Sequence, residues 1–134
     1  MTPDDLLFAK THEWVRLEDD PAGGKLATVG LSAFALEALT DLVFLDLPEV
    51  GRRAEAGQPF GEVESVKAVS DLYSPVDGEI VEVNTEIADK LETLSNDPYG
   101  AGWLVKIKLS DESALANLLD AAAYKKQCEE EAES

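Results

Sequence analysis

Apolar and polar side chains alternate along much of the chain, and clusters of Gly, Pro, Asp and Asn interrupt this alternation at short intervals. An alternation with a period of two residues is typical of strands that bury one face. Short strands separated by turn residues favour an all-β body. The pattern predicts strands at residues 12–18, 25–31, 42–47, 60–66, 69–73, 79–83 and 103–109.

Two of these segments differ in their apolar content. Residues 42–47 read Leu-Val-Phe-Leu-Asp-Leu, and this nearly continuous apolar run predicts a buried strand. The segment 103–109 instead places two lysines between its apolar residues. We therefore expect this strand to have one face in water.

Two further segments predict helices. Ser32 is a suitable N-cap for a short helix at 33–39, directly after the second strand. Ser110 is a second candidate N-cap, and the acidic residues after it favour the positive end of a helix dipole. The apolar stripe of this C-terminal helix would comprise Leu115, Leu118, Leu119 and Ala122. The predicted fold class is mainly β, a β-sandwich with a short helix after strand 2 and a C-terminal helix.

The size and charge of the chain limit the classes of partner. A chain of 134 residues with 45% hydrophobic residues suits one domain, which we place at 1–128. The acidic tail at 129–134 has nothing apolar to bury and is expected to be frayed. A formal net charge of −17 disfavours binding to nucleic acid and to anionic lipid, and it favours encounter with basic protein surfaces.

Cysteine content and the N-terminus bear on the compartment. Cys128 is the only cysteine, so the chain forms no internal disulfide, and the pattern fits a reducing compartment. We expect no metal site. The first ten residues lack the basic start and apolar run of a secretion signal, and no run is long enough to span a bilayer. We expect a cytoplasmic protein, or a mitochondrial matrix protein if a presequence has been removed.

Lys67 is the strongest candidate functional residue. It lies between two predicted strands, and turn residues follow at Pro75 and Gly78, which predicts that its amine stands at the tip of a hairpin. A protonated lysine is a poor nucleophile near neutral pH. An acyl cofactor attached there through an amide would remove the charge and lengthen the flexible stem. The position is therefore typical of a swinging-arm carrier.

The surroundings of Lys67 resemble those in the lipoyl and biotinyl carrier families. Gly57 lies ten residues before the lysine, and Pro75 and Gly78 lie eight and eleven residues after it. Biotinyl domains place the lysine in a Met-Lys-Met triplet, whereas this chain has Val66-Lys67-Ala68. The resemblance thus favours lipoate over biotin, and it implies a barrel-sandwich hybrid fold.

A more specific resemblance covers about residues 7 to 128. The chain resembles the H-protein family of the glycine cleavage system, whose motifs include Thr-His-Glu-Trp-Val near the start and Val-Glu-Ser-Val-Lys-Ala around the lysine. The matching stretches are 11–15, 29–32, 41–51, 63–68, 74–84 and 97–103.

This resemblance implies a monomeric, non-catalytic shuttle with lipoate covalently attached to Lys67. Such a shuttle takes an aminomethyl group from glycine decarboxylase, the P protein, and delivers it to the aminomethyltransferase, the T protein. Its electrons pass to dihydrolipoamide dehydrogenase, the L protein. A lipoate ligase or lipoyl transferase would attach the cofactor. An alternative is a lipoate relay that donates lipoyl groups to 2-oxoacid dehydrogenases, because the same hairpin serves both tasks.

The resemblance also assigns roles to five further residues. Thr11, Glu13 and Asp71 match residues that line a cleft sheltering the loaded arm. Glu64 and Gly78 match positions that lipoate-attaching enzymes read. Physical alternatives remain open: Glu13 and Asp71 are also explained as solvated acids at strand ends, and Gly78 as a turn residue with positive φ.

Two other functions remain as rivals. His12, Glu13 and Cys128 carry the chemical groups for nucleophilic catalysis, but no triad or nucleophile-elbow spacing accompanies them. We therefore assign His12 no proton-transfer role. The last rival is a structural domain without any modification.

Overall fold

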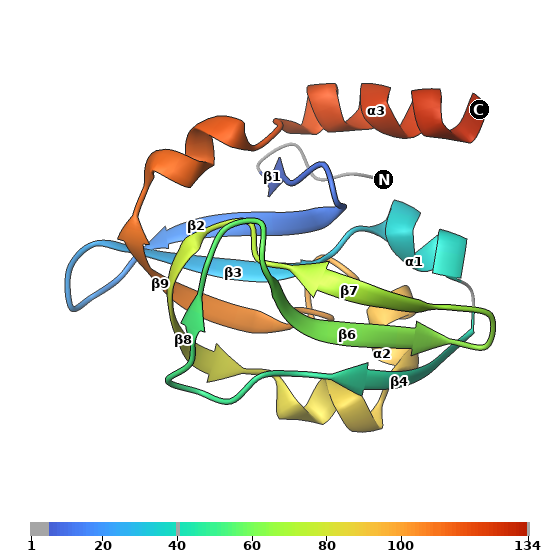
Figure 1. The fold of residues 1–134 in the computed structure, drawn as a ribbon, viewed down its shortest axis with the longest axis horizontal. Coiled ribbons are helices and arrows are strands. Elements are labelled where there is room, and N and C mark those ends of the chain that lie inside the picture. The colour runs from blue at the N-terminus through green and yellow to red at the C-terminus, as the bar shows by residue number, and fades with distance from the viewer. Residues whose placement is uncertain (1–5, 40, 134) are drawn as a thin grey trace.

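The computed structural model describes residues 6–39 and 41–133, which form two antiparallel sheets flanked by helices (Figure 1). The larger sheet has the strand order β1-β2-β3-β9-β8-β5, and the smaller has the order β4-β6-β7. The strands of the larger sheet are β1 (Leu7–Phe8), β2 (Glu13–Asp19), β3 (Lys25–Leu31), β5 (Arg53–Ala54), β8 (Asp77–Val83) and β9 (Val105–Asp111). Those of the smaller are β4 (Leu42–Asp46), β6 (Pro59–Ser65) and β7 (Val69–Tyr73).

The main core lies between the two sheets. Val29, Ile80 and Ile107 of the larger sheet form one buried cluster with Leu45 and Val63 of the smaller sheet. Burial of side chains of this size stabilises the fold by about 1.5–3 kcal/mol each. The predicted mainly-β sandwich is therefore confirmed, and all seven predicted strands are present, with boundaries shifted by up to two residues.

The predicted helix after the second strand is also present. It is α1 (Ala33–Leu39), and Ser32 caps it, because the Ser32 Oγ accepts a hydrogen bond from the Ala35 N–H at 3.2 Å. Two short helical segments, η1 (Thr85–Asp89) and α2 (Glu92–Asn96), had no clear sequence signal. A third, η2 (Ser113–Asn117), falls where the sequence predicts the C-terminal helix, but it is a short 3-10 helix.

The prediction of a buried strand at 42–47 is wrong. Only Leu45 is buried in β4, while Val43 and Phe44 are 50% and 55% exposed. The cause is tertiary: β4 is an edge strand, and a break in its register with β6 falls between Leu42 and Phe44. The apolar run therefore faces solvent over part of its length.

The predicted start of the C-terminal helix at Ser110 is also wrong. Residues 110 and 111 belong to β9, and Asp111 pairs with Asp77 of β8. The C-terminal helix α3 (Ala121–Glu133) begins after Leu119, whose backbone pairs with Phe8. Ladder hydrogen bonds to β8 and β1 thus outweigh the local capping signal.

Helix α3 lies over the N-terminal strand (Figure 1). Its Tyr124 is buried and stacks on Phe8, with ring centroids 4.2 Å apart and planes 3° from parallel. Trp14 joins them in a second apolar cluster. The acidic residues 129–133 are helical, and residue 134 lies outside the described residues. The fraying expected of this tail in solution stays a prediction.

Candidate functional site

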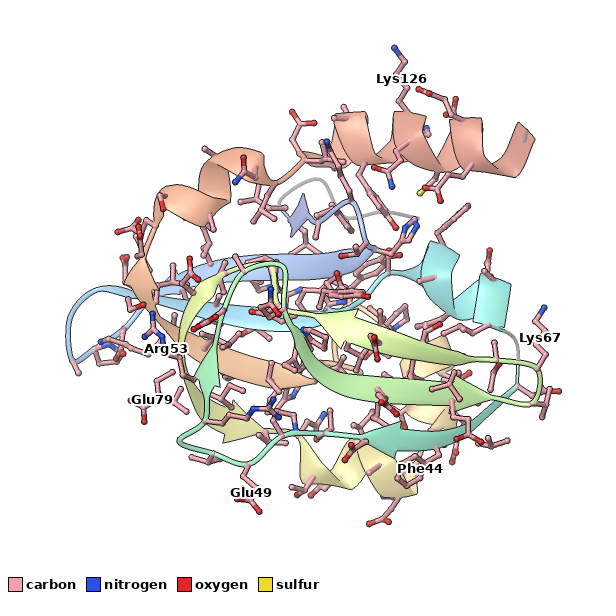
Figure 2. All side chains as sticks on the ribbon, viewed as in Figure 1. Phe44, Glu49, Arg53, Lys67, Glu79 and Lys126 are labelled. Carbon is pink, nitrogen blue, oxygen red and sulfur yellow. The ribbon has the colours of Figure 1, made fainter. Side chains whose placement is uncertain are left out.

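Lys67 stands at the tip of the hairpin formed by β6 and β7, as the sequence predicts (Figure 2). The turn is held at its base, because the Ser65 N–H donates to the Ala68 carbonyl at 2.8 Å. The Ser65 Oγ also accepts from the Ala68 N–H at 3.2 Å. A third hydrogen bond, from the Val66 N–H to the Asp41 carbonyl at 3.0 Å, ties the turn to the chain before β4. The hairpin therefore presents its lysine from a fixed base.

The Lys67 side chain is exposed. Among the described residues, none of the ion pairs involves this amine. Figure 2 shows the side chain pointing away from the body of the protein. An attached acyl group would thus extend into solvent without breaking any of these ion pairs.

A cavity of about 450 Å³ lies along β7, on the side of the hairpin that faces α1. Thr11, Glu13 and Asp71 all line it, so the structure brings together the three residues assigned to the cleft. The other lining residues are His12, Leu31, Phe34, Ala35, Ala38, Leu39, Val63, Ser70, Leu72, Tyr73 and Glu131.

The arm attached to Lys67 would be long enough to reach this cavity. Four residues of strand separate Lys67 from Asp71, on the order of 13 Å at about 3.3 Å per residue. A lysine side chain extended by a lipoyl group contains about a dozen bonds between Cα and sulfur. At about 1.2 Å of extension per bond this gives on the order of 15 Å. The residues present therefore fit a lipoyl group that folds back along β7.

Glu13 is a buried acid in the lining of the cavity. Its side chain is buried, its Oε1 accepts a hydrogen bond from the Thr11 hydroxyl, and its Oε2 accepts from the Tyr73 N–H at 3.2 Å. Burial raises the pKa of this carboxyl from its ordinary value of 4.5 to about 7, although the hydrogen bonds act in the opposite direction. The interpretation of Glu13 as a solvated acid is therefore wrong, whereas Asp71 is exposed.

His12 occupies a turn that directs Glu13 inward. Its φ is +81°, which is uncommon for a residue with a side chain. Its N–H donates to the Ala9 carbonyl at 2.9 Å, and the Ala9 N–H donates to the Glu13 carbonyl at 2.8 Å. This turn places Glu13 at the first position of β2, with its side chain in the cavity.

The side chains of His12 and Cys128 do not form a nucleophilic site. His12 Nδ1 lies 2.7 Å from the Tyr124 hydroxyl and its Nε2 lies 3.3 Å from a Glu131 oxygen. Burial raises the pKa of the Cys128 thiol, so the thiolate that nucleophilic catalysis needs is disfavoured. These contacts argue against the catalytic rival.

Gly78 does not have the positive φ that a turn role predicts. It lies in β8 of the larger sheet, where a Cβ atom would meet the Lys108 carbonyl oxygen and the Ile107 side chain of β9. Glycine is thus required at position 78 because β8 and β9 approach too closely there to leave room for a Cβ atom. Glu64 is exposed next to the lysine turn, opposite Val69. The roles of Glu64 and Gly78 in recognition by a ligase stay predictions.

Sequence reasoning missed Phe34, Tyr73 and Glu131 as cavity residues. Phe34 stacks on His12 with ring centroids 5.2 Å apart, and Glu131 reaches His12 from a position 119 residues away in sequence. No local pattern signals contacts of this separation.

The described residues contain no helix that is both long and apolar enough to cross a membrane. In the same part of the chain, no group of three or more His, Cys, Asp or Glu side chains is arranged to hold a metal ion.

Comparison with known proteins gives one consistent family. The family model described as Glycine cleavage H-protein matches residues 6–131. A glycine cleavage system H protein of Rhodopirellula baltica is 56% identical over 128 residues, which are 96% of each chain. One of Rubrobacter xylanophilus is 51% identical over 129 residues, again 96% of each. The crystal structure of a glycine cleavage system H protein from Mycobacterium marinum superposes with a TM-score of 0.84 at 44% identity, covering 93% of this chain and 97% of that one.

Proposed function

The chain belongs to the glycine cleavage H-protein family, and on this premise we propose that it is the lipoylated shuttle of that system, with lipoate attached to Lys67. The observation that carries the proposal is the exposed Lys67 amine at the tip of a hydrogen-bonded hairpin. The matching family and the curated relatives are named as H proteins of the glycine cleavage system, and an H protein is a lipoyl carrier without catalytic activity of its own.

The partners of this shuttle would be the glycine decarboxylase, the aminomethyltransferase and the dihydrolipoamide dehydrogenase, together with the enzyme that attaches lipoate. When bound, the lipoyl dithiolane supplies a disulfide that accepts electrons and a thiol that carries the aminomethyl group. The chain itself holds the base of the arm at the Ser65–Ala68 turn and offers a cavity in which the loaded end would be shielded from bulk water. We place the protein in the cytoplasm, as a monomer with its carrier domain at 1–128.

Intact-protein mass after incubation with a lipoate ligase tests the attachment. We expect one lipoyl increment on the wild-type chain and none on Lys67→Arg, which keeps the charge and the length of the side chain. An increment that persists in Lys67→Arg, or none on the wild type, contradicts the proposed site.

A glycine-dependent exchange of carbon dioxide with a glycine decarboxylase tests the shuttle role against the lipoate relay. Exchange that requires the lipoylated chain supports the shuttle. A lipoylated chain that supports no exchange, but passes its lipoyl group to a 2-oxoacid dehydrogenase, favours the relay.

A further inference from the structure

Among the residues that the structure describes, three carboxylates line the cavity, and they come from three different elements. Glu13 belongs to β2, Asp71 to β7 and Glu131 to the C-terminal helix α3. An aminomethyl group at the end of the arm would carry a positive charge as an ammonium. An opposite charge within about 4–6 Å stabilises such a cation. Each of the three acids is a candidate counter-charge for this ammonium group, and they differ in ionisation and in exposure.

Glu13 and Asp71 are imperfect counter-charges for different reasons. Burial raises the pKa of Glu13 to about 7, so its carboxyl is only partly ionised near neutral pH. Asp71 is exposed and pairs in register with Glu62, a residue of the same charge. Glu13 is positioned but only partly ionised, and Asp71 is in contact with solvent.

Glu131 is both ionised and held in place. Its Oε2 accepts a hydrogen bond from the Gln127 amide at 2.8 Å, and its Oε1 lies 3.3 Å from His12 Nε2. The Gln127 amide also donates to the Lys10 carbonyl at 2.9 Å, which fixes the amide from a second side. The hydrogen bond from Gln127, followed by the interaction with His12, lowers the pKa of Glu131.

A chain of hydroxyl groups sets the orientation of His12. The Ser32 Oγ lies 2.5 Å from the Tyr124 hydroxyl, which in turn lies 2.7 Å from His12 Nδ1. The Glu131 carboxylate only accepts hydrogen bonds, so the tautomer that fits its contact with His12 carries the hydrogen on Nε2. In that tautomer Nδ1 accepts from the Tyr124 hydroxyl, which keeps its proton because burial raises the pKa of Tyr124. This series of hydrogen bonds thus extends from Ser32, the N-cap of α1, to the Glu131 carboxylate of α3.

We propose that Glu131 is a counter-charge for the ammonium of the loaded arm and that His12 is the positioning residue that aims it into the cavity. This inference rests on the proposed function and adds the C-terminal helix to the binding site. Among the described residues of α3, Glu131 is the one that lines the cavity, and its side chain is 44% exposed.

The chemistry of the arm explains why a counter-charge matters. Hydrolysis adds water to the methylene carbon, breaks its C–N and C–S bonds, and releases ammonium, formaldehyde and the free thiol without a change of oxidation state. The C–S bond breaks when the nitrogen lone pair expels the sulfur. A nitrogen held as ammonium has no free lone pair. A carboxylate beside it favours the protonated form and slows the loss of the carbon.

The lifetime of the loaded arm in Glu131→Gln is the first test, with Glu130→Gln as the matched control on the same helix. Glu130 is exposed and does not line the cavity. We expect formaldehyde release to become about two- to fivefold faster in Glu131→Gln, the range of a partly exposed ion pair, and to be unchanged in Glu130→Gln. Equal release from both variants and the wild type overturns the inference.

A second readout does not depend on release. The ¹³C signal of the Glu131 carboxyl is titrated in the lipoylated protein before and after loading, and we expect the midpoint to fall on loading. An unmoved midpoint also overturns the inference. Thermal unfolding of both variants identifies any loss of structure. If the wild type fails to accept lipoate or the aminomethyl group, the proposed function fails. If it loads normally and Glu131→Gln matches its control, only the present inference fails.

Discussion

The Glu13 carboxylate of β2 and the Tyr73 N–H of β7 form a hydrogen bond of 3.2 Å that joins the two sheets at the cavity. Because β7 is an edge strand, its backbone has donors that no neighbouring strand uses. A buried carboxylate takes one of them. The contact therefore couples the environment of Glu13 to the strand that follows Lys67.

Burial of the Glu13 carboxyl predicts a pH dependence of stability. The pKa of Glu13 is raised from 4.5 to about 7 in the folded protein, so between these pH values the folded state binds more protons than the unfolded state. The free energy of unfolding should therefore fall as pH rises through this window, by about 3 kcal/mol at most from this group. Urea unfolding at pH 4.5, 6 and 8 measures it, with Glu13→Gln as reference. If the wild type and the variant change in parallel, Glu13 does not contribute.

Replacement of Glu13 should separate attachment from protection. Glu13→Ala leaves the lysine hairpin intact, so we expect normal lipoylation by intact mass. The cavity loses a hydrogen-bonded acid, so the loaded arm should release formaldehyde several times faster. Thr11→Val removes the hydroxyl that donates to Glu13 and should give a smaller effect in the same direction. Unchanged release in Glu13→Ala would count against the cleft assignment.

The lysine turn should lose its fixed base in Ser65→Ala. The Ser65 Oγ accepts from the Ala68 N–H at 3.2 Å and donates to the Ala68 carbonyl at 3.3 Å. Loss of these bonds should reduce the free energy of unfolding by about 0.5–1.5 kcal/mol and lower the initial rate of lipoylation. Ser70→Ala on the same hairpin is the control. A normal rate in Ser65→Ala would mean that the ligase does not require a preformed turn.

Gly78→Ala tests the close approach of β8 and β9. A Cβ at this position would meet backbone atoms of Lys108, which cannot move without disturbing the strand. We expect a loss of about 1–3 kcal/mol in the free energy of unfolding. Chemical denaturation measures it, and Glu79→Ala, at the exposed neighbouring position, should change stability much less. A stable Gly78→Ala that is poorly lipoylated would instead support a direct role in recognition.

The strands and the lysine hairpin could be predicted from the sequence because their signals are local. Alternation with a period of two residues located the flanking strands of Lys67, and turn residues bounded them. Local sequence signals gave wrong predictions where pairing between strands decided the conformation or the exposure of a residue. Ser110 has the side chain of an N-cap, yet it extends β9, and Phe44 has the side chain of a core residue, yet it lies on an edge strand.

The sequence by itself determined which residue presents the amine and which strands carry it, since both follow from neighbours along the chain. Only the tertiary structure decided that Glu13 is buried, because its environment comes from β7 and α1. The same holds for Glu131, which meets His12 across 119 positions. Desolvation and long-range hydrogen bonds depend on how the sheets and helices pack, and no local pattern of residues records that packing.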